Sequence, residues 1–78
     1  MQTMKQHEKA RKWRNERRLT VEKLSELSGW SIEAIYLFER GVTPKGEPVS
    51  DWVWQRYKMV CAGIDAELRS GVRFDWGN

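Results

Sequence analysis

The sequence has little of what builds covalently stabilised or membrane-bound proteins. Its 78 residues include one cysteine and one histidine, so no disulfide can form within the chain and no Cys/His metal site can be assembled. No apolar run approaches the roughly 18 residues of a membrane span, and the first residues offer no apolar stretch for a signal peptide. We therefore expect a cytoplasmic protein with no cofactor, no metal and no membrane partner.

The same scarcity argues against an enzyme. No catalytic Ser/His/Asp, Cys/His or paired-carboxylate arrangement can be drawn around the single histidine, His7, and the single cysteine, Cys61. A glycine-rich loop suited to phosphate is also missing. We expect His7 to be solvated and Cys61, which falls at core spacing, to lie in the interior.

Positive charge is concentrated at one end of the chain. The net charge is +3, but residues 1–18 hold seven basic and two acidic side chains and so carry +5. A basic helix face of this kind is either a solvated surface or a surface that meets a polyanion. Charge alone leaves both interpretations open.

Hydrophobic periodicity predicts two helices in the first part of the chain. The first covers about residues 5–18, where Ala10 and Trp13 form a narrow apolar stripe on an otherwise basic helix. Thr20 is the expected N-cap of a second helix that ends near Ser28, with Gly29 as its C-cap. A short turn follows.

Two more helices are expected after the turn. Ser31 is the predicted N-cap of the third, and Gly41 ends it at a position that favours positive φ. Residues 42–48 include two prolines and a glycine and cannot continue that helix. The fourth runs from about residue 49 or 50 to Ala62. The sequence thus predicts an all-α fold, a small bundle of four to five helices in a single domain over residues 1–78. The predicted core comprises Val21, Leu24, Leu27, Trp30, Ile35, Phe38, Val53, Tyr57, Val60, Cys61 and Ile64.

The centre of the chain carries a specific spacing. A small residue, Ser25, is followed four positions later by the turn glycine, Gly29; Ile35 comes six positions further on, and Phe38 three beyond that. Two helices that cross closely need this order of small, flexible and apolar residues. With Arg14, Leu19-Thr20, Leu24 and the closing Glu39-Arg40-Gly41, residues 14–64 resemble the helix-turn-helix domain of the phage repressor and Cro type, often called XRE. Ser25 departs from the alanine usual in that family, and we expect its hydroxyl to bond back to the backbone.

The resemblance implies a DNA-binding regulator that acts as a repressor, of phage or mobile-element type, and binds a bipartite site on double-stranded DNA as a homodimer. It implies a structural ion pair between Arg14 and Glu39. It places the N-terminal half of the third helix in the major groove. The surface meeting bases would then comprise Ser31, Ile32, Glu33, Tyr36 and Leu37, with Thr20 and Val21 on the second helix, and phosphate contacts would come from Arg17 or Arg18, Lys23, Arg40 and Lys45.

The chemistry of that surface suggests weak sequence discrimination. Glu33 can accept from a cytosine amine, Ser31 can bond to either base edge, and Ile32 can touch a thymine methyl group. No Arg, Gln or Asn stands among these positions to make the bidentate contacts that discriminate best. Glu33 equally fits a purely structural role, as a charge that stabilises the helix dipole.

Two other functions remain open. Ile32, Tyr36 and Leu37 form an apolar group that suits a protein contact, so the chain could be a protein-interaction module with the same fold. It could also be a DNA-binding accessory subunit of a larger phage assembly, such as a packaging or recombination machine.

The predicted C-terminal tail, residues 65–78, ends in an alternating pattern. The segment VRFDW is typical of a short strand, and a strand of this length is marginal alone. It is expected either to pair with the same strand of a second copy or to fold back over the fourth helix, with Trp76 covering Trp52 or Met59. The predicted dimer interface comprises Trp52, Met59, Val72, Phe74 and Trp76.

Overall fold

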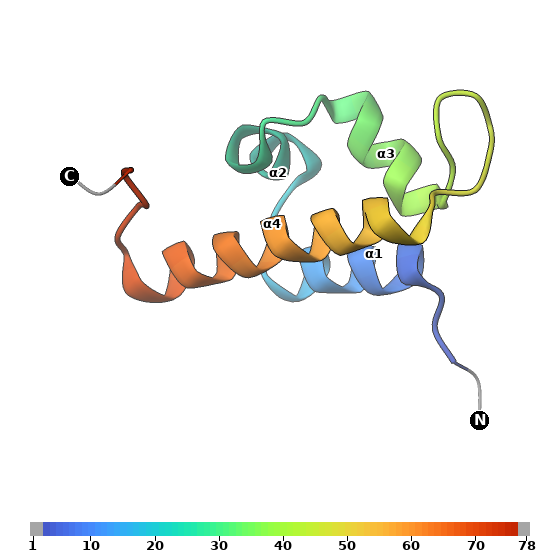
Figure 1. Cartoon of the computed structure of the whole chain (residues 1–78). Coiled ribbons are helices and arrows are strands. Elements are labelled where there is room, and N and C mark those ends of the chain that lie inside the picture. The colour runs from blue at the N-terminus through green and yellow to red at the C-terminus, as the bar shows by residue number, and fades with distance from the viewer. Residues whose placement is uncertain (1–2, 77–78) are drawn as a thin grey trace.

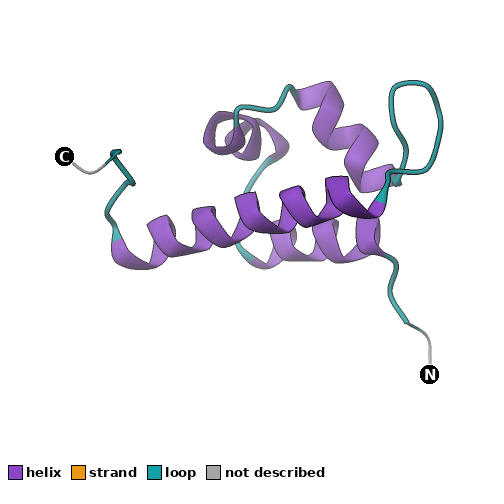
Figure 2. Cartoon of the chain, viewed as in Figure 1, coloured by secondary structure: helices purple, strands orange, loops and turns teal. Residues whose placement is uncertain are grey.

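The computed structural model describes residues 3–76, and the described chain is all-α, as predicted (Figures 1 and 2). The helices are α1 (Gln6–Glu16), α2 (Val21–Ser28), α3 (Ile32–Arg40) and α4 (Asp51–Ser70). Within residues 3–76 no strand forms, and the loop before α4 contains one isolated bridge between Val42 and Pro48. None of the helices in this range is long and apolar enough to cross a membrane.

The helices are arranged around α4. In Figure 1 α2 and α3 lie on one side of α4, and α1 runs along it. Helix α3 packs against both α1 and α2, and α2 also contacts α4. The pair formed by α2, its turn and α3 therefore rests on a support made by α1 and α4.

The core consists of two adjoining clusters. One contains Val21, Leu24, Ile35 and Ile64, and the other contains Ala10, Trp54 and Tyr57. Trp30 packs against both clusters and stacks on Tyr57, with ring centroids 4.8 Å apart. The predicted core residues Leu27, Phe38, Val60 and Cys61 are partly buried around these clusters, and Val53 is half-buried.

Two helix boundaries differ from the prediction. Helix α1 covers residues 6–16 rather than 5–18, because Arg17 is its C-cap and Arg18 has a φ of 56° that no right-handed helix accommodates. Helix α4 ends at Ser70, eight residues beyond the predicted Ala62. Gly63 does not stop it, since the buried Ile64 holds the following turn on the core and Gly71, with φ 72°, supplies the C-cap.

The tail also differs from the prediction. The described part beyond α4, residues 71–76, forms no strand within the chain. Trp76 is 89% exposed, and Trp52 and Met59 are also exposed, so the expectation that Trp76 covers either of them is wrong. The ring of Trp76 contacts Phe74 instead, with centroids 5.8 Å apart. Strand pairing needs a second copy and stays a prediction.

Candidate nucleic-acid interface

The turn between α2 and α3 is fixed by local hydrogen bonds. Gly29 takes a φ of 81°, and its backbone N–H donates to the Ser25 carbonyl. The Ser25 hydroxyl donates to the Trp30 carbonyl at 2.6 Å, so it does bond to the backbone, but across the turn rather than within its own helix. The Trp30 N–H in turn donates to the Ser28 hydroxyl at 3.1 Å. These bonds set the orientation of α3 relative to α2.

Both helices of this pair begin at the surface with the expected hydroxyl caps. The Thr20 hydroxyl accepts from the backbone N–H of Lys23 at 3.0 Å, and the Ser31 hydroxyl accepts from that of Ala34 at 3.1 Å. Thr20 and Ser31 are exposed. An exposed helix N-terminus carries partial positive charge and free backbone donors, which suit an anion such as phosphate.

The outer face of α3 carries most of the residues predicted to meet bases. Ser31, Ile32, Glu33 and Tyr36 are all exposed. Their partners on the other side of the helix, Ile35 and Glu39, are buried. These four residues are therefore accessible together at the N-cap and in the first turns of α3.

Leu37 and Val21 do not belong to this accessible face. Leu37 is only half-exposed and lines a shallow groove against the loop that leads to α4, with Val42, Pro48 and Val53. The loop returns beside the end of α3 because the Val49 N–H donates to the Gly41 carbonyl at 3.2 Å. Val21 is buried in the core. Val21 is therefore structural, and the prediction that it meets bases is wrong, whereas a base contact by the partly exposed Leu37 stays a prediction.

The predicted phosphate contacts fall into two groups. Arg18, Lys23, Arg40 and Lys45 are exposed, and Lys23 lies 3.3 Å from Glu26 on its own helix. Arg17 is different, because its guanidinium donates to both carboxylate oxygens of Asp65 on α4, with Nη2 at 2.8 Å from Oδ2. Of the two α1 arginines offered as alternatives, Arg18 is the one whose charge remains available.

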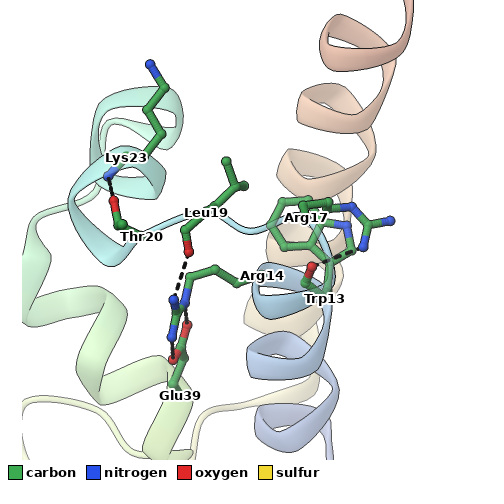
Figure 3. A network of polar contacts seen from close by, with 7 residues as sticks. All are labelled: Trp13, Arg14, Arg17, Leu19, Thr20, Lys23 and Glu39. Carbon is green, nitrogen blue, oxygen red and sulfur yellow. Dashed lines mark hydrogen bonds and ion pairs between the residues drawn. The ribbon is translucent and has the colours of Figure 1, made fainter.

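The expected pair of Arg14 and Glu39 is present (Figure 3). Arg14 Nε donates to Glu39 Oε2 at 2.6 Å and Nη2 donates to Oε1 at 3.0 Å, while Nη1 donates to the Leu19 carbonyl at 2.9 Å. The bond to Glu39 raises the pKa of Arg14 above its ordinary value. One guanidinium thus ties α1 to the last turn of α3 and to the segment entering α2.

A second network, which sequence reasoning missed, joins α1 to α4. Asp65 accepts from Arg17 and from the indole Nε1 of Trp13, the latter at 3.1 Å. The guanidinium carbon of Arg17 lies 4.7 Å from the centre of the Trp13 ring, and Figure 3 shows the two side chains stacked. The bond from Arg17 lowers the pKa of Asp65 below its ordinary value.

The single cysteine, Cys61, and the single histidine, His7, are both partly buried. Burial raises the pKa of Cys61 to about 12, so its thiol is not nucleophilic at neutral pH. His7 is half-buried rather than solvated, and a Cβ on Gly41 would come within 2.8 Å of its Nδ1. Among residues 3–76 no three His, Cys, Asp or Glu side chains gather as a metal site would require.

Comparison of the chain with protein-family models, with curated proteins and with solved structures finds no match. The interpretation of the surface formed by α2 and α3 therefore depends on its own geometry. That geometry combines two exposed helix N-termini with four exposed basic side chains at the end of α1, on α2, at the end of α3 and in the following loop.

Proposed function

We propose that this protein is a DNA-binding transcriptional regulator that acts as a repressor. It binds DNA as a homodimer and places α3 of each subunit in the major groove. The observation that carries the proposal is the rigid presentation of two exposed helix N-termini, α2 and α3, by the locked turn and the Arg14–Glu39 pair. A recognition helix must be held in one orientation to read base edges. In the cell we place the protein in the cytoplasm.

In this proposal phosphates and bases are contacted by different side chains. Arg18, Lys23, Arg40 and Lys45 bind phosphates and set affinity without sequence preference. Ser31, Ile32 and Glu33 meet base edges. Tyr36 packs against the sugar or a thymine methyl group at the edge of this surface. Because none of the residues assigned to base edges can make a bidentate contact with guanine or adenine, discrimination is modest within one half-site and depends on two half-sites together.

The test is binding to duplex DNA over a series of salt concentrations. Arg40→Ala and Lys45→Ala should each weaken binding to every sequence alike and reduce the slope of log K against log salt by about one, because each lost phosphate contact retains about one counterion. Lys58→Ala is the matched control, because Lys58 is exposed on α4 beside a groove lined by α1. It should leave the slope unchanged.

Selection of preferred sequences completes the test. Ser31→Ala and Glu33→Ala should change which sequence is enriched while leaving the salt slope intact. If Arg40→Ala, Lys45→Ala and Lys58→Ala all behave like the unchanged protein, the DNA-binding surface is not the one formed by α2 and α3.

A second candidate function is supported by the apolar part of the same surface. Ile32 and Tyr36 are large, exposed and one turn apart on α3, a pattern that also suits the surface of a partner protein. A protein-interaction module predicts no DNA binding at low salt, and a DNA-binding accessory subunit of a phage assembly predicts binding without any enriched sequence. The salt series and the selection together separate the three functions.

A further inference from the structure

One face of α4 has the spacing of a helix-pairing seam. Along it lie six exposed residues at intervals that alternate between four and three: Trp52, Arg56, Met59, Gly63, Ala66 and Ser70. Intervals of four and three residues are the spacing by which one stripe of a helix packs against a neighbouring helix, and over these six positions they average about 3.6 residues, one turn of an α-helix. The seam points away from the core, since the buried Trp54, Tyr57 and Ile64 lie on the opposite side of α4.

The two halves of the seam differ in size. The N-terminal half is large: Trp52 is 62% exposed, Met59 is 72% exposed, and the Arg56 guanidinium carbon lies 5.1 Å from the centre of the Trp52 ring. The C-terminal half carries only Gly63, Ala66 and Ser70. One half therefore projects side chains and the other half leaves space.

Nothing in residues 3–76 requires a glycine at position 63. Glycine is among the least favourable residues inside a helix, and a Cβ at this position would meet nothing of the described chain within 4 Å. Its φ lies in the ordinary helical range, so the backbone does not require it either. A glycine in such a place allows another backbone to approach closely.

We propose that α4 pairs with α4 of a second copy, antiparallel, about a two-fold axis level with Cys61. This register sets each large residue on a small one: Trp52 on Ser70 of the partner subunit, Arg56 on Ala66 of the partner subunit, and Met59 on Gly63 of the partner subunit. The symmetry repeats each contact, so one self-complementary face serves both subunits. The paired length is about 27 Å at 1.5 Å per residue.

Charges beside the seam fit the same register. Glu67 lies next to Ala66, so Arg56 comes level with Glu67 of the partner subunit on one flank. On the other flank Asp51 comes within one helical turn of Arg69 of the partner subunit. Asp51, Arg56 and Arg69 are exposed and Glu67 is half-exposed. A parallel pairing would instead set Arg56 beside Arg56 of the partner subunit, which is repulsive.

The end of α4 leaves room for the second copy. Figure 1 shows the last turns of α4 running past α2, away from the other helices. Leu68, on the side of α4 that faces the core further upstream, is half-exposed at this end.

This pairing would supply the homodimer of the proposed function, and its use on DNA rests on that proposed function. Its test measures association without DNA, so the two can fail separately.

The first test is sedimentation equilibrium of the full chain and two variants. Gly63→Gln puts a long side chain where the two backbones approach and should weaken self-association at least about tenfold. It should also leave folding intact or raise the thermal midpoint, because glutamine is a better helix former than glycine. Lys58→Gln, on the same helix but off the seam, should associate like the unchanged chain.

The second test uses the flanking charges. Arg56→Glu and Glu67→Arg should each impair self-association, because each sets like charges level across the axis. A mixture of these two variants should form a heterodimer, since position 56 of each subunit then faces an opposite charge at position 67 of the other. A parallel pair would also attract in this mixture, but it already sets like charges level in the unchanged chain, so neither variant alone should weaken it. Loss in each single variant together with recovery in the mixture therefore distinguishes the antiparallel register.

Three results would overturn the proposal. The first is an unchanged chain that stays monomeric at about 1 mM, where even a weak specific dimer would form; the exposed face would then belong to another protein or to none. The second is Gly63→Gln that dimerises like Lys58→Gln. The third is loss of the dimer when residues 72–78 are deleted, which would indicate the strand-paired tail instead. Under our proposal that deletion leaves a dimer.

Discussion

Arg14, within α1, and Arg17, at its C-cap, lie three residues apart, and each binds a carboxylate of another helix with two nitrogens. Arg14 reaches Glu39 on α3, and the two side chains are 15% and 7% exposed. Arg17 reaches Asp65 on α4, and the corresponding values are 30% and 21%. The two pairs therefore share the same chemistry but differ in burial. The more buried pair, Arg14–Glu39, is called the inner pair and holds the proposed recognition helix, and Arg17–Asp65 is called the outer pair.

The difference in burial decides what each pair contributes. A charge removed from water must be compensated by its partner, and loss of that partner leaves it stranded at high cost. A pair with access to water is partly screened, and its loss is partly compensated by hydration. The Arg17 pair has a further support, because the guanidinium stacks on Trp13 and remains in contact when Asp65 is lost. We therefore expect the inner pair to dominate.

The largest expected effect follows loss of the inner carboxylate. Glu39→Ala should lower the free energy of unfolding by roughly 2 to 4 kcal/mol, because it strands the Arg14 guanidinium in a site with little water. Urea denaturation of this variant beside the unchanged chain measures the loss. Glu39→Gln, which keeps the shape and one acceptor, should fall between the two. A loss no larger than that from the outer pair would show that burial does not set the contributions of the two pairs apart.

The outer pair should give a smaller loss. Asp65→Asn should cost about 1 kcal/mol, because the half-exposed Arg17 regains water and keeps its stack on Trp13. The amide oxygen can still accept one bond from the guanidinium or the indole. Because Asp65 fixes α4 and not α3, DNA binding at low salt should change less than in Glu39→Ala at matched folded fraction.

The dependence on pH gives a further test of the prediction for Asp65→Asn. Arg17 lowers the pKa of Asp65 in the folded state below its ordinary value of 3.8. The ionised Asp65 therefore makes its full contribution to the free energy of unfolding at pH values above its unfolded-state pKa. That contribution is lost as the pH falls through its folded-state pKa. The difference in unfolding free energy between the unchanged chain and Asp65→Asn should stay constant from about pH 7 to 5 and shrink below about pH 4. A difference that persists at the acid end would show that the effect is packing and not charge.

The same comparison explains which parts of the molecule could be predicted from the sequence. The caps at Thr20, Gly29, Ser31 and Gly41 were predicted because a cap depends on bonds that span only three or four residues. The Arg14–Glu39 pair spans 25 residues and was reached only through the resemblance to repressor domains. Local chemistry alone gave no sign of it.

The outer pair was missed because it depends on the length of α4. Asp65 lies 48 residues from Arg17 and falls in the predicted tail, because the fourth helix was expected to end at about Ala62. Burial of Ile64 overrides the weak local preference of glycine, as tertiary contacts commonly do. Val21 was misplaced for a similar reason, because its burial is set by packing against Ile35 and Ile64. The wrong predictions therefore concern features that are set by packing between segments distant in the sequence.

The smallest expected effect on stability concerns the third acidic residue, Glu33, which is exposed in the first turn of α3. Unlike Glu39 and Asp65, it is bound by no arginine in the described chain, and its only expected structural role is to complement the helix dipole. Glu33→Ala should therefore cost well under 1 kcal/mol of unfolding free energy. If Glu33 also reads a cytosine amine, sequence selection with this variant should lose enrichment at one position of each half-site while overall affinity at low salt rises, since a negative charge near phosphates is removed. An unchanged selection profile would assign Glu33 to the dipole alone and leave Ser31 and Ile32 as the base contacts.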